Sequence, residues 1–229
     1  MYSHFLKGIA YLKDLPDSII EKLNSRVKTA TYKKGEFIYH EDEIAKCVYF
    51  VKSGLIKLKK FNGEGKEIVF GIKPSGSTFA ETSLFCDKNT TYSETAQAVE
   101  RSEVLYLLTS DLEEIIALNP NFSVEMIRLM GAQLRFSTSI LRDLALLDIY
   151  SKTLKTIERL AREFGKQTED GVKIEVPLTI QDLANIVGST RESVSRAVSK
   201  LKKQGLVTVD EKTIIINDWA DFRVMFESY

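Results

Sequence analysis

The stretch PLTIQDLANIVGSTRESVSRAVSKLKKQGLVT, residues 177–208, decides the fold of the C-terminal part of this chain. Thr179 is followed three residues later by Asp182, a spacing typical of a capped helix start, and apolar residues then recur at helical intervals. Gly188 is the kind of residue that follows a helix end, because a left-handed backbone costs it nothing. A second helix is predicted to begin at Ser189. Two short helices are therefore expected, joined by a tight turn.

The second predicted helix has two faces of opposite character. One is an apolar stripe, and the other carries charged and hydroxyl side chains of the kinds that pair with base edges in a DNA major groove. Ala184 is small enough to let the two helices cross closely, which favours a helix-turn-helix over an unrelated helical hairpin in a core. The residues predicted to contact DNA are Ser189, Arg191, Glu192, Ser195, Arg196, Ser199 and Lys200.

Charge is balanced over the chain but not over this helix. The 229 residues carry a formal net charge of zero, so DNA must be recognised by a local patch. Residues 189–203 hold a single acid, Glu192, beside Arg191, Arg196, Lys200, Lys202 and Lys203. This basic face favours DNA as the partner over a protein.

Composition excludes several classes of protein. Cys47 and Cys86 are too few for a disulfide scaffold, and neither an export signal nor a membrane-spanning run is visible, so a soluble cytoplasmic protein without a membrane partner is expected. No catalytic triad, metal-ligand spacing or phosphate-cradling glycine loop occurs, so no enzyme, no metal and no certain cofactor is predicted.

The N-terminal half reads as short strands separated by turn signals, after a short helix at Leu15–Leu23. Asn62-Gly63 predicts a hairpin between two of them. Such regular spacing suggests an antiparallel barrel or jelly roll and an α+β chain. The predicted strands are Thr29–Tyr32, Glu36–His40, Cys47–Lys52, Leu55–Phe61, Glu67–Ile72, Thr95–Val99 and Val104–Leu108.

Helical periodicity follows, first at Asp111–Leu118, which Pro120 is expected to end, and then from Phe122 to about Leu147. The long helix repeats apolar residues in sevens, interrupted once by Ser137, and this pattern favours pairing with a second copy over packing on the barrel alone. The predicted dimer interface is Ile127, Met130, Leu134, Ser137, Leu141 and Leu144.

Asp148 is predicted to cap a further helix, Ile149–Phe164, which ends at Gly165. A strand at Lys173–Val176 leads into the helix-turn-helix, and strands at Gly205–Val209 and Lys212–Asn217 form a wing around Asp210-Glu211. The tail, Asp218–Tyr229, is expected to be helical or extended. The expected parts are a barrel domain (1–120), a dimerisation helix with a hinge at Leu147–Asp148 (121–148) and a winged helix-turn-helix (149–229).

A barrel, a long helix and a winged helix-turn-helix in this order resemble the Crp–Fnr family of bacterial transcription regulators over nearly the whole chain. Its most specific part is GSTRESVSR, residues 188–196, where the resemblance implies that Arg191, Glu192 and Arg196 read bases of a palindrome with TGTGA-like half-sites. Glu192 has a second interpretation, because Ser189 and Glu192 have capping-box spacing. The resemblance also implies RNA polymerase as a partner if the protein is an activator.

The family's cyclic-AMP-binding branch is matched only in part. Glu81 and Ser93 fit its pattern, but Ala80 replaces a glycine and Tyr92 stands where an arginine would grip the phosphate. The expected effector is therefore a small molecule other than cyclic AMP, such as an aromatic or carboxylate compound with Arg135 or Lys88 supplying charge. The predicted effector pocket is Glu81, Thr82, Tyr92, Ser93, Ser137 and Thr138.

Two alternatives stay open, a cyclic-nucleotide-responsive regulator and an effector-independent one with a vestigial pocket. Two separated cysteines cannot hold an iron–sulfur cluster, which needs four thiolates. Haem ligation by Cys86 and a redox pair of Cys47 with Cys86 are the weaker sensor hypotheses.

Overall fold

The computed structural model describes residues 2–210 and 212–227. The chain forms two compact units, Met1–Phe136 and Ser137–Tyr229. The long helix α4 (Pro120–Leu146) belongs to both, because the division falls inside it. The sequence placed the hinge later, at Leu147–Asp148, and these residues separate α4 from the next helix.

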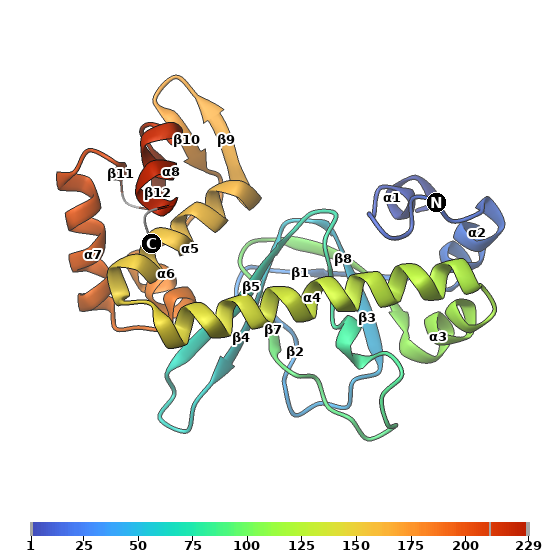
Figure 1. The fold of residues 1–229 in the computed structure, drawn as a ribbon. Coiled ribbons are helices and arrows are strands. Elements are labelled where there is room, and N and C mark those ends of the chain that lie inside the picture. Colours follow the sequence, from blue (N-terminus) through green and yellow to red (C-terminus); the bar gives the residue numbers. More distant parts are fainter. Residues whose placement is uncertain (1, 211, 228–229) are drawn as a thin grey trace. The chain divides into compact units, whose positions relative to one another are not determined.

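The first unit contains two antiparallel sheets, as the jelly-roll prediction required (Figure 1). Neither sheet closes on itself, so the jelly-roll form of the predicted barrel or jelly roll is the one that the chain adopts. One sheet has the order β1 (Lys28–Tyr32), β8 (Ser102–Leu108), β3 (Cys47–Ser53), β6 (Thr78–Phe79), and the other β2 (Phe37–Tyr39), β7 (Thr95–Ala98), β4 (Leu55–Phe61), β5 (Glu67–Pro74).

The predicted strands all form, while the two-residue β6 is too short to leave a pattern in the sequence. The predicted hairpin also forms, and the Asn62 side chain accepts hydrogen bonds from the backbone of Glu64 and Lys66 in its turn. Between β3 and β4, Gly54 has a φ of +88°, and a Cβ there would lie 2.3 Å from the Ser102 hydroxyl. No other residue fits that turn without displacing β8.

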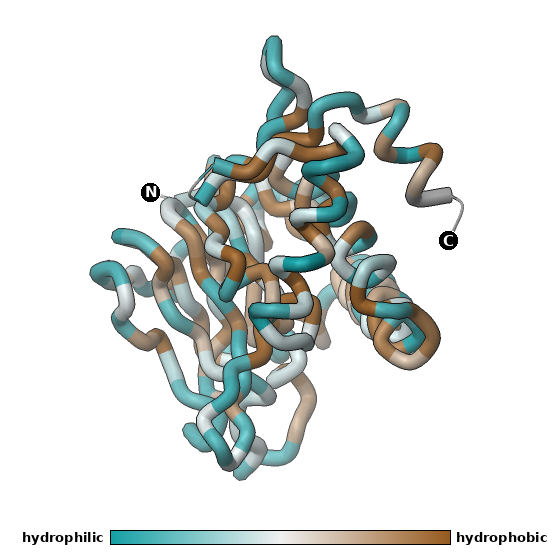
Figure 2. The backbone as a smooth tube through the Cα atoms, turned by 90° about the vertical axis from the view of Figure 1, so that its left-hand side faces the viewer, coloured by the Kyte–Doolittle hydropathy of each residue, from teal (hydrophilic) through white to brown (hydrophobic). Residues whose placement is uncertain are grey.

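Hydrophilic and hydrophobic stretches are interleaved along the backbone, as the colouring of the tube in Figure 2 shows. In the first unit the buried residues form two groups. One lies among the strands and includes Tyr39, Tyr49, Phe79 and Tyr92. The other joins strands β3 and β8 to helices and includes Leu6, Leu23, Phe50 and Phe122.

The helices of this unit are α1 (Ser3–Lys7), α2 (Asp17–Arg26), α3 (Thr109–Ala117) and the first part of α4. Pro120, which was expected to end α3, is the first residue of α4. Proline is tolerated there because the first turn of a helix needs no N–H donor. Whether Pro120 ends α3 or begins α4, the break between the two helices lies just before it.

After the end of α4, the second unit continues with α5 (Ile149–Phe164), which has the bounds that the sequence predicted. Asp148 caps α5 by accepting from the Ser151 N–H at 2.7 Å. A small sheet of order β11 (Val207–Asp210), β12 (Thr213–Ile216), β10 (Gly171–Ile174), β9 (Gly165–Thr168) combines the wing with a hairpin. The sequence did not predict β9, because its glycine and polar residues show no alternation of apolar and polar side chains. The tail forms α8 (Trp219–Glu227), and Glu211 and residues 228–229 lie outside the described residues.

Candidate nucleic-acid interface and effector pocket

The helix-turn-helix consists of α6 (Ile180–Val187) and α7 (Arg191–Lys203). At the start of α6 the Thr179 hydroxyl accepts from the Asp182 N–H at 3.1 Å, and the Asp182 carboxylate accepts from the Thr179 N–H at 3.1 Å. Gly188 ends α6 with a φ of 72°, and Ala184 is fully buried. The predicted capping box, turn glycine and close-contact alanine are confirmed.

The start of α7 differs from the prediction by one residue. Thr190, and not Ser189, is the capping residue, and its hydroxyl accepts from the Ser193 N–H at 3.3 Å. The capping box of Ser189 with Glu192 is therefore wrong, because the capping hydroxyl and the N–H that donates to it each lie one residue further along the chain. Glu192 lies in the first turn of α7 with an exposed side chain. Its carboxylate is thus available for another contact.

The two faces of α7 separate as the sequence predicted. Val194, Ala197, Val198 and Leu201 are buried. Ser189 is half-buried, and the other residues predicted to contact DNA are exposed, namely Arg191, Glu192, Ser195, Arg196, Ser199 and Lys200. The Arg196 guanidinium lies 3.4 Å from the Ser193 hydroxyl oxygen, one turn toward the start of the helix. The result is a basic, solvent-facing helix surface with an apolar underside.

The residues predicted to form the effector pocket do not share one environment. Tyr92 is only 5% exposed and stacks on Tyr39, with ring centroids 3.7 Å apart. Its hydroxyl accepts from the Cys47 N–H at 3.1 Å and lies 3.4 Å from the Tyr49 hydroxyl. Burial raises the pKa of Tyr92. Tyr92 is thus part of an aromatic core between the strands, in addition to any contact with a ligand.

Carboxylates dominate the polar part of this region. Glu81, in a 3₁₀ turn (Glu81–Ser83), is 4% exposed and accepts a short hydrogen bond from the Thr78 hydroxyl. Ser93 donates to Glu94, and its hydroxyl lies 3.3 Å from that of Thr82. Burial raises the pKa of Glu94, and the charge of Glu81 raises it further. The charges of Lys73 and Lys60 act in the opposite direction but do not reverse the shift, so the fold disfavours the ionised form of Glu94.

Ser137 and Thr138 lie on α4 in the second unit, and both are exposed. Their place in the effector pocket stays a prediction, because each unit is described by itself. Glu94 was missed in the sequence, although its position next to Ser93 was an available signal.

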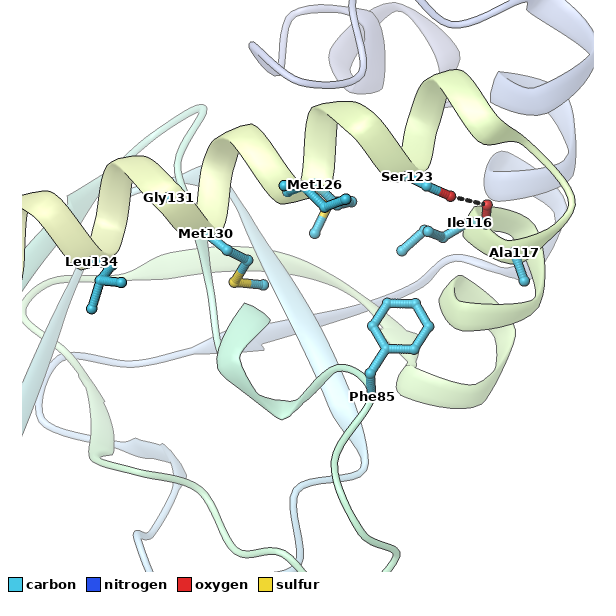
Figure 3. Close-up of a pocket in the computed structure, with 9 residues that line it drawn as sticks. Phe85, Ile116, Ala117, Ser123, Met126, Met130, Gly131 and Leu134 are labelled. Carbon is cyan, nitrogen blue, oxygen red and sulfur yellow. Dashed lines mark hydrogen bonds between the residues drawn. The ribbon is translucent and has the colours of Figure 1, made fainter.

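An apolar pocket of about 580 Å³ lies in the first unit between α3, α4 and the loop after Glu81 (Figure 3). The hydroxyl of Ser123, which lines it, is engaged with the Ile116 carbonyl at 2.9 Å. Phe85 has a φ of 58°, and its N–H donates to the Glu113 carboxylate at 2.6 Å. The lining residues are Phe85, Ile116, Ala117, Ser123, Met126, Ile127, Met130, Gly131 and Leu134.

Three apolar residues of the predicted dimer interface are largely exposed. Ile127, Leu134 and Leu141 are 71%, 69% and 65% exposed. Leu144 is 38% exposed, and Ser137 is also exposed. Met130 differs, because it is half-buried and packs against the core of its own unit. Within its own chain, this face of α4 is thus largely uncovered.

No group of three or more potential metal ligands occurs among the described residues. Cys47 is half-buried, and the exposed Cys86 thiol lies 3.1 Å from the Thr82 carbonyl oxygen. In the part of the chain that the structure describes, no helix is both long enough and apolar enough to span a bilayer.

Comparison with known proteins identifies both halves of the chain. Residues 29–119 match the cyclic nucleotide-binding domain, and residues 155–225 match the Crp-like helix-turn-helix domain. An anaerobic regulatory protein of Bacillus subtilis is 30% identical over 208 residues, which are 91% of this chain and 87% of that protein. The cAMP-activated global transcriptional regulator CRP of Salmonella typhimurium is 26% identical, over 89% of this chain and 96% of that protein.

Solved structures show the same fold at lower identity. FixK2 from Bradyrhizobium japonicum has a TM-score of 0.75 at 21% identity, covering 86% of this chain and 96% of that one. The c-di-GMP-responsive regulator CLP of Xanthomonas campestris has a TM-score of 0.74 at 21% identity, covering 88% and 99%. With its two matched domains and a relative of 30% identity along nearly its full length, this chain belongs to the Crp–Fnr family of DNA-binding transcription regulators and is not an enzyme.

Proposed function

We propose that the protein acts as a homodimer that reads a palindrome with TGTGA-like half-sites. The observation that carries this proposal is the exposed face of α7, on which Arg191, Glu192 and Arg196 stand over a buried apolar stripe. An arginine fork fits the O6 and N7 atoms of guanine, and a glutamate accepts from the cytosine amine. Since Thr190 caps the helix, base reading by Glu192 no longer competes with a capping role.

Pairing through α4 would bring together two such helices. Ile127, Leu134 and Leu141 recur every seven residues with about two thirds of their surface exposed, which is costly for a monomer in water. Ile127 and Leu134 also line the apolar pocket, so a second copy on this face would contact two of its lining residues. A dimer also suits a palindromic site, whose half-sites lie about 34 Å apart.

The effector is proposed to be a small molecule other than cyclic AMP. A buried phosphate needs a charge-assisted partner, and Tyr92 offers only a hydroxyl that is already engaged with Cys47 and Tyr49. Glu81 and Glu94 add negative charge near this region, and the charges of Lys73 and Lys60 partly offset it at Glu94. An uncharged or cationic effector fits these groups better than the carboxylate compound that the sequence suggested.

A second candidate is an effector-independent regulator with a vestigial pocket. The stacking of Tyr39 on Tyr92 and of Tyr49 on Phe79 favours it, because these rings fill space between the strands. Mass spectrometry of ligands retained by the purified protein, followed by DNA binding with and without them, separates the two candidates. A retained compound that changes DNA affinity supports effector control, and unchanged affinity supports the vestigial pocket.

DNA reading is tested by fluorescence anisotropy with a duplex carrying two TGTGA half-sites and a second duplex with scrambled half-sites. We expect tighter binding to the first duplex, with the preference reduced in Arg196→Ala, while the exposed Lys33→Ala serves as a control outside the interface. Equal affinity for both duplexes would contradict the proposed half-site.

The dimer is tested by sedimentation of Leu134→Glu, which is expected to be monomeric. The effector class is tested by calorimetric titration with cyclic AMP, and micromolar binding would contradict it.

A further inference from the structure

Tyr150 joins the first turn of α5 to the last turns of α7, the recognition helix that carries the proposed DNA contacts. The ammonium of Lys200 lies over its ring, 4.2 Å from the centroid. Its hydroxyl donates to the Gln204 side-chain oxygen at 2.6 Å. Lys200 and Gln204 are four residues apart, so the tyrosine spans one turn at the end of α7. Nothing in the sequence pattern around the predicted hinge singled out this tyrosine.

The two contacts restrict a side chain that is otherwise free to move. A lysine carries four rotatable bonds, and its ammonium loses that freedom when it binds a phosphate. A ring under the ammonium attracts it and uses only one of its sides, so N–H donors remain for a phosphate oxygen. The carboxylate of Asp148, at the start of α5, is near enough to interact with the Lys200 charge. Hydrogen bonds from Ser151 lower the pKa of Asp148, and the positive charge of Lys200 lowers it further.

We infer that Tyr150 is a positioning residue for DNA binding, which holds the Lys200 ammonium ready for a phosphate of the DNA backbone. The inference rests on the proposed DNA contact of Lys200. The hydrogen bond from the Tyr150 hydroxyl to Gln204 fixes the ring, and the ring restricts the Lys200 ammonium. Lys200 therefore loses less side-chain entropy when it binds a phosphate of the DNA backbone. A phosphate contact carries no sequence information, so Tyr150 raises affinity for every duplex alike.

The test is a double-mutant cycle on the full-length chain. Tyr150→Met keeps an apolar side chain but removes the ring and the hydroxyl, Tyr150→Phe keeps the ring, and Lys200→Gln removes the charge. Affinities for the half-site and scrambled duplexes are measured by anisotropy over a range of salt concentrations. Circular dichroism melting of each variant reports whether the fold is retained.

We expect Lys200→Gln to weaken both duplexes alike and to lower the salt slope by about 1 per subunit. Tyr150→Met should weaken both duplexes by about two- to fivefold per subunit, as expected for an exposed cation–π contact. Tyr150→Phe, the matched control, should keep most of the affinity. In the Lys200→Gln background, Tyr150→Met should have no further effect.

Two results would overturn the inference. An equal loss from Tyr150→Met with and without Lys200 would show that Tyr150 acts only in packing α5 against α7. If the methionine variant unfolds, Tyr150→Phe decides the case through the hydroxyl: a loss that is equal with and without Lys200 would show that the bond to Gln204 does not act through the ammonium. An unchanged affinity in Lys200→Gln would remove the phosphate contact itself. A half-site preference that still depends on Arg196 would leave the proposed function standing in both cases.

Discussion

The recognition helix and the interior between the N-terminal sheets differ in how exposed the residues are that carry the family resemblance. On α7 the side chains matched to the family are exposed, and the apolar residues that hold the helix are different ones on its other face. In the N-terminal unit, Glu81, which fits the family pattern, and Tyr92, which stands in place of its arginine, are themselves buried and bonded to neighbours of this chain. On the helix surface, the residues proposed to contact DNA are different from those that stabilise the helix. In the sheet interior, the residues proposed to form the effector pocket also stabilise the fold.

The strongest test of this difference is truncation of Tyr92. Tyr92→Ala removes a ring stacked on Tyr39 and leaves a cavity, so the free energy of unfolding should fall by about 3–5 kcal/mol in urea denaturation. Tyr92→Phe, which keeps the ring, should lose only about 0.5–1.5 kcal/mol for the hydrogen bonds. A loss below 1 kcal/mol in Tyr92→Ala would mean that this residue belongs to an open pocket.

The opposite result is expected on α7. Arg196→Ala should change the free energy of unfolding by less than about 0.5 kcal/mol, because the side chain is exposed. Its discrimination between half-site and scrambled duplexes should fall by about 1–3 kcal/mol in competition binding. A marked loss of stability with unchanged discrimination would show that Arg196 is structural.

The corrected cap of α7 gives a smaller effect on stability. Thr190→Ala removes the acceptor of the Ser193 N–H and should cost about 1 kcal/mol in urea denaturation. Ser189→Ala, one residue earlier, should stay within about 0.5 kcal/mol. The reverse order of the two variants would restore the cap that the sequence suggested.

Glu94 should give the smallest effect, and one that depends on pH. Burial and the charge of Glu81 raise its pKa in the folded chain. As the pH rises from the unfolded pKa to the folded pKa, the carboxyl ionises more readily in the unfolded chain, so the free energy of unfolding falls. Glu94→Gln should therefore raise Tm at neutral pH, by about 2 °C, and leave it nearly unchanged in acid, below both pKa values. A variant that is stabilised equally at both pH values would exclude this ionisation as the cause.

The sequence by itself determined the order of elements and the faces of the recognition helix. Asp148 as the cap of α5 and Gly188 as the turn residue could be predicted because caps and turns depend on a few neighbouring residues. The stripe of Val194, Val198 and Leu201 could be predicted because helical periodicity fixes which residues share a face. The cap of α7 was one residue off, since Ser189 and Thr190 have the same capping chemistry.

Only the tertiary structure decided what surrounds each side chain between the sheets and at the end of α7. Tyr92 meets Tyr39 and Cys47, which are distant in the sequence, so its burial could not be predicted from its own neighbours. Tyr150 meets Lys200 and Gln204 for the same reason. Periodicity assigns a residue to a face, but the residues that cover that face come from other elements, and their packing fixes burial, pKa and the partners of each polar group.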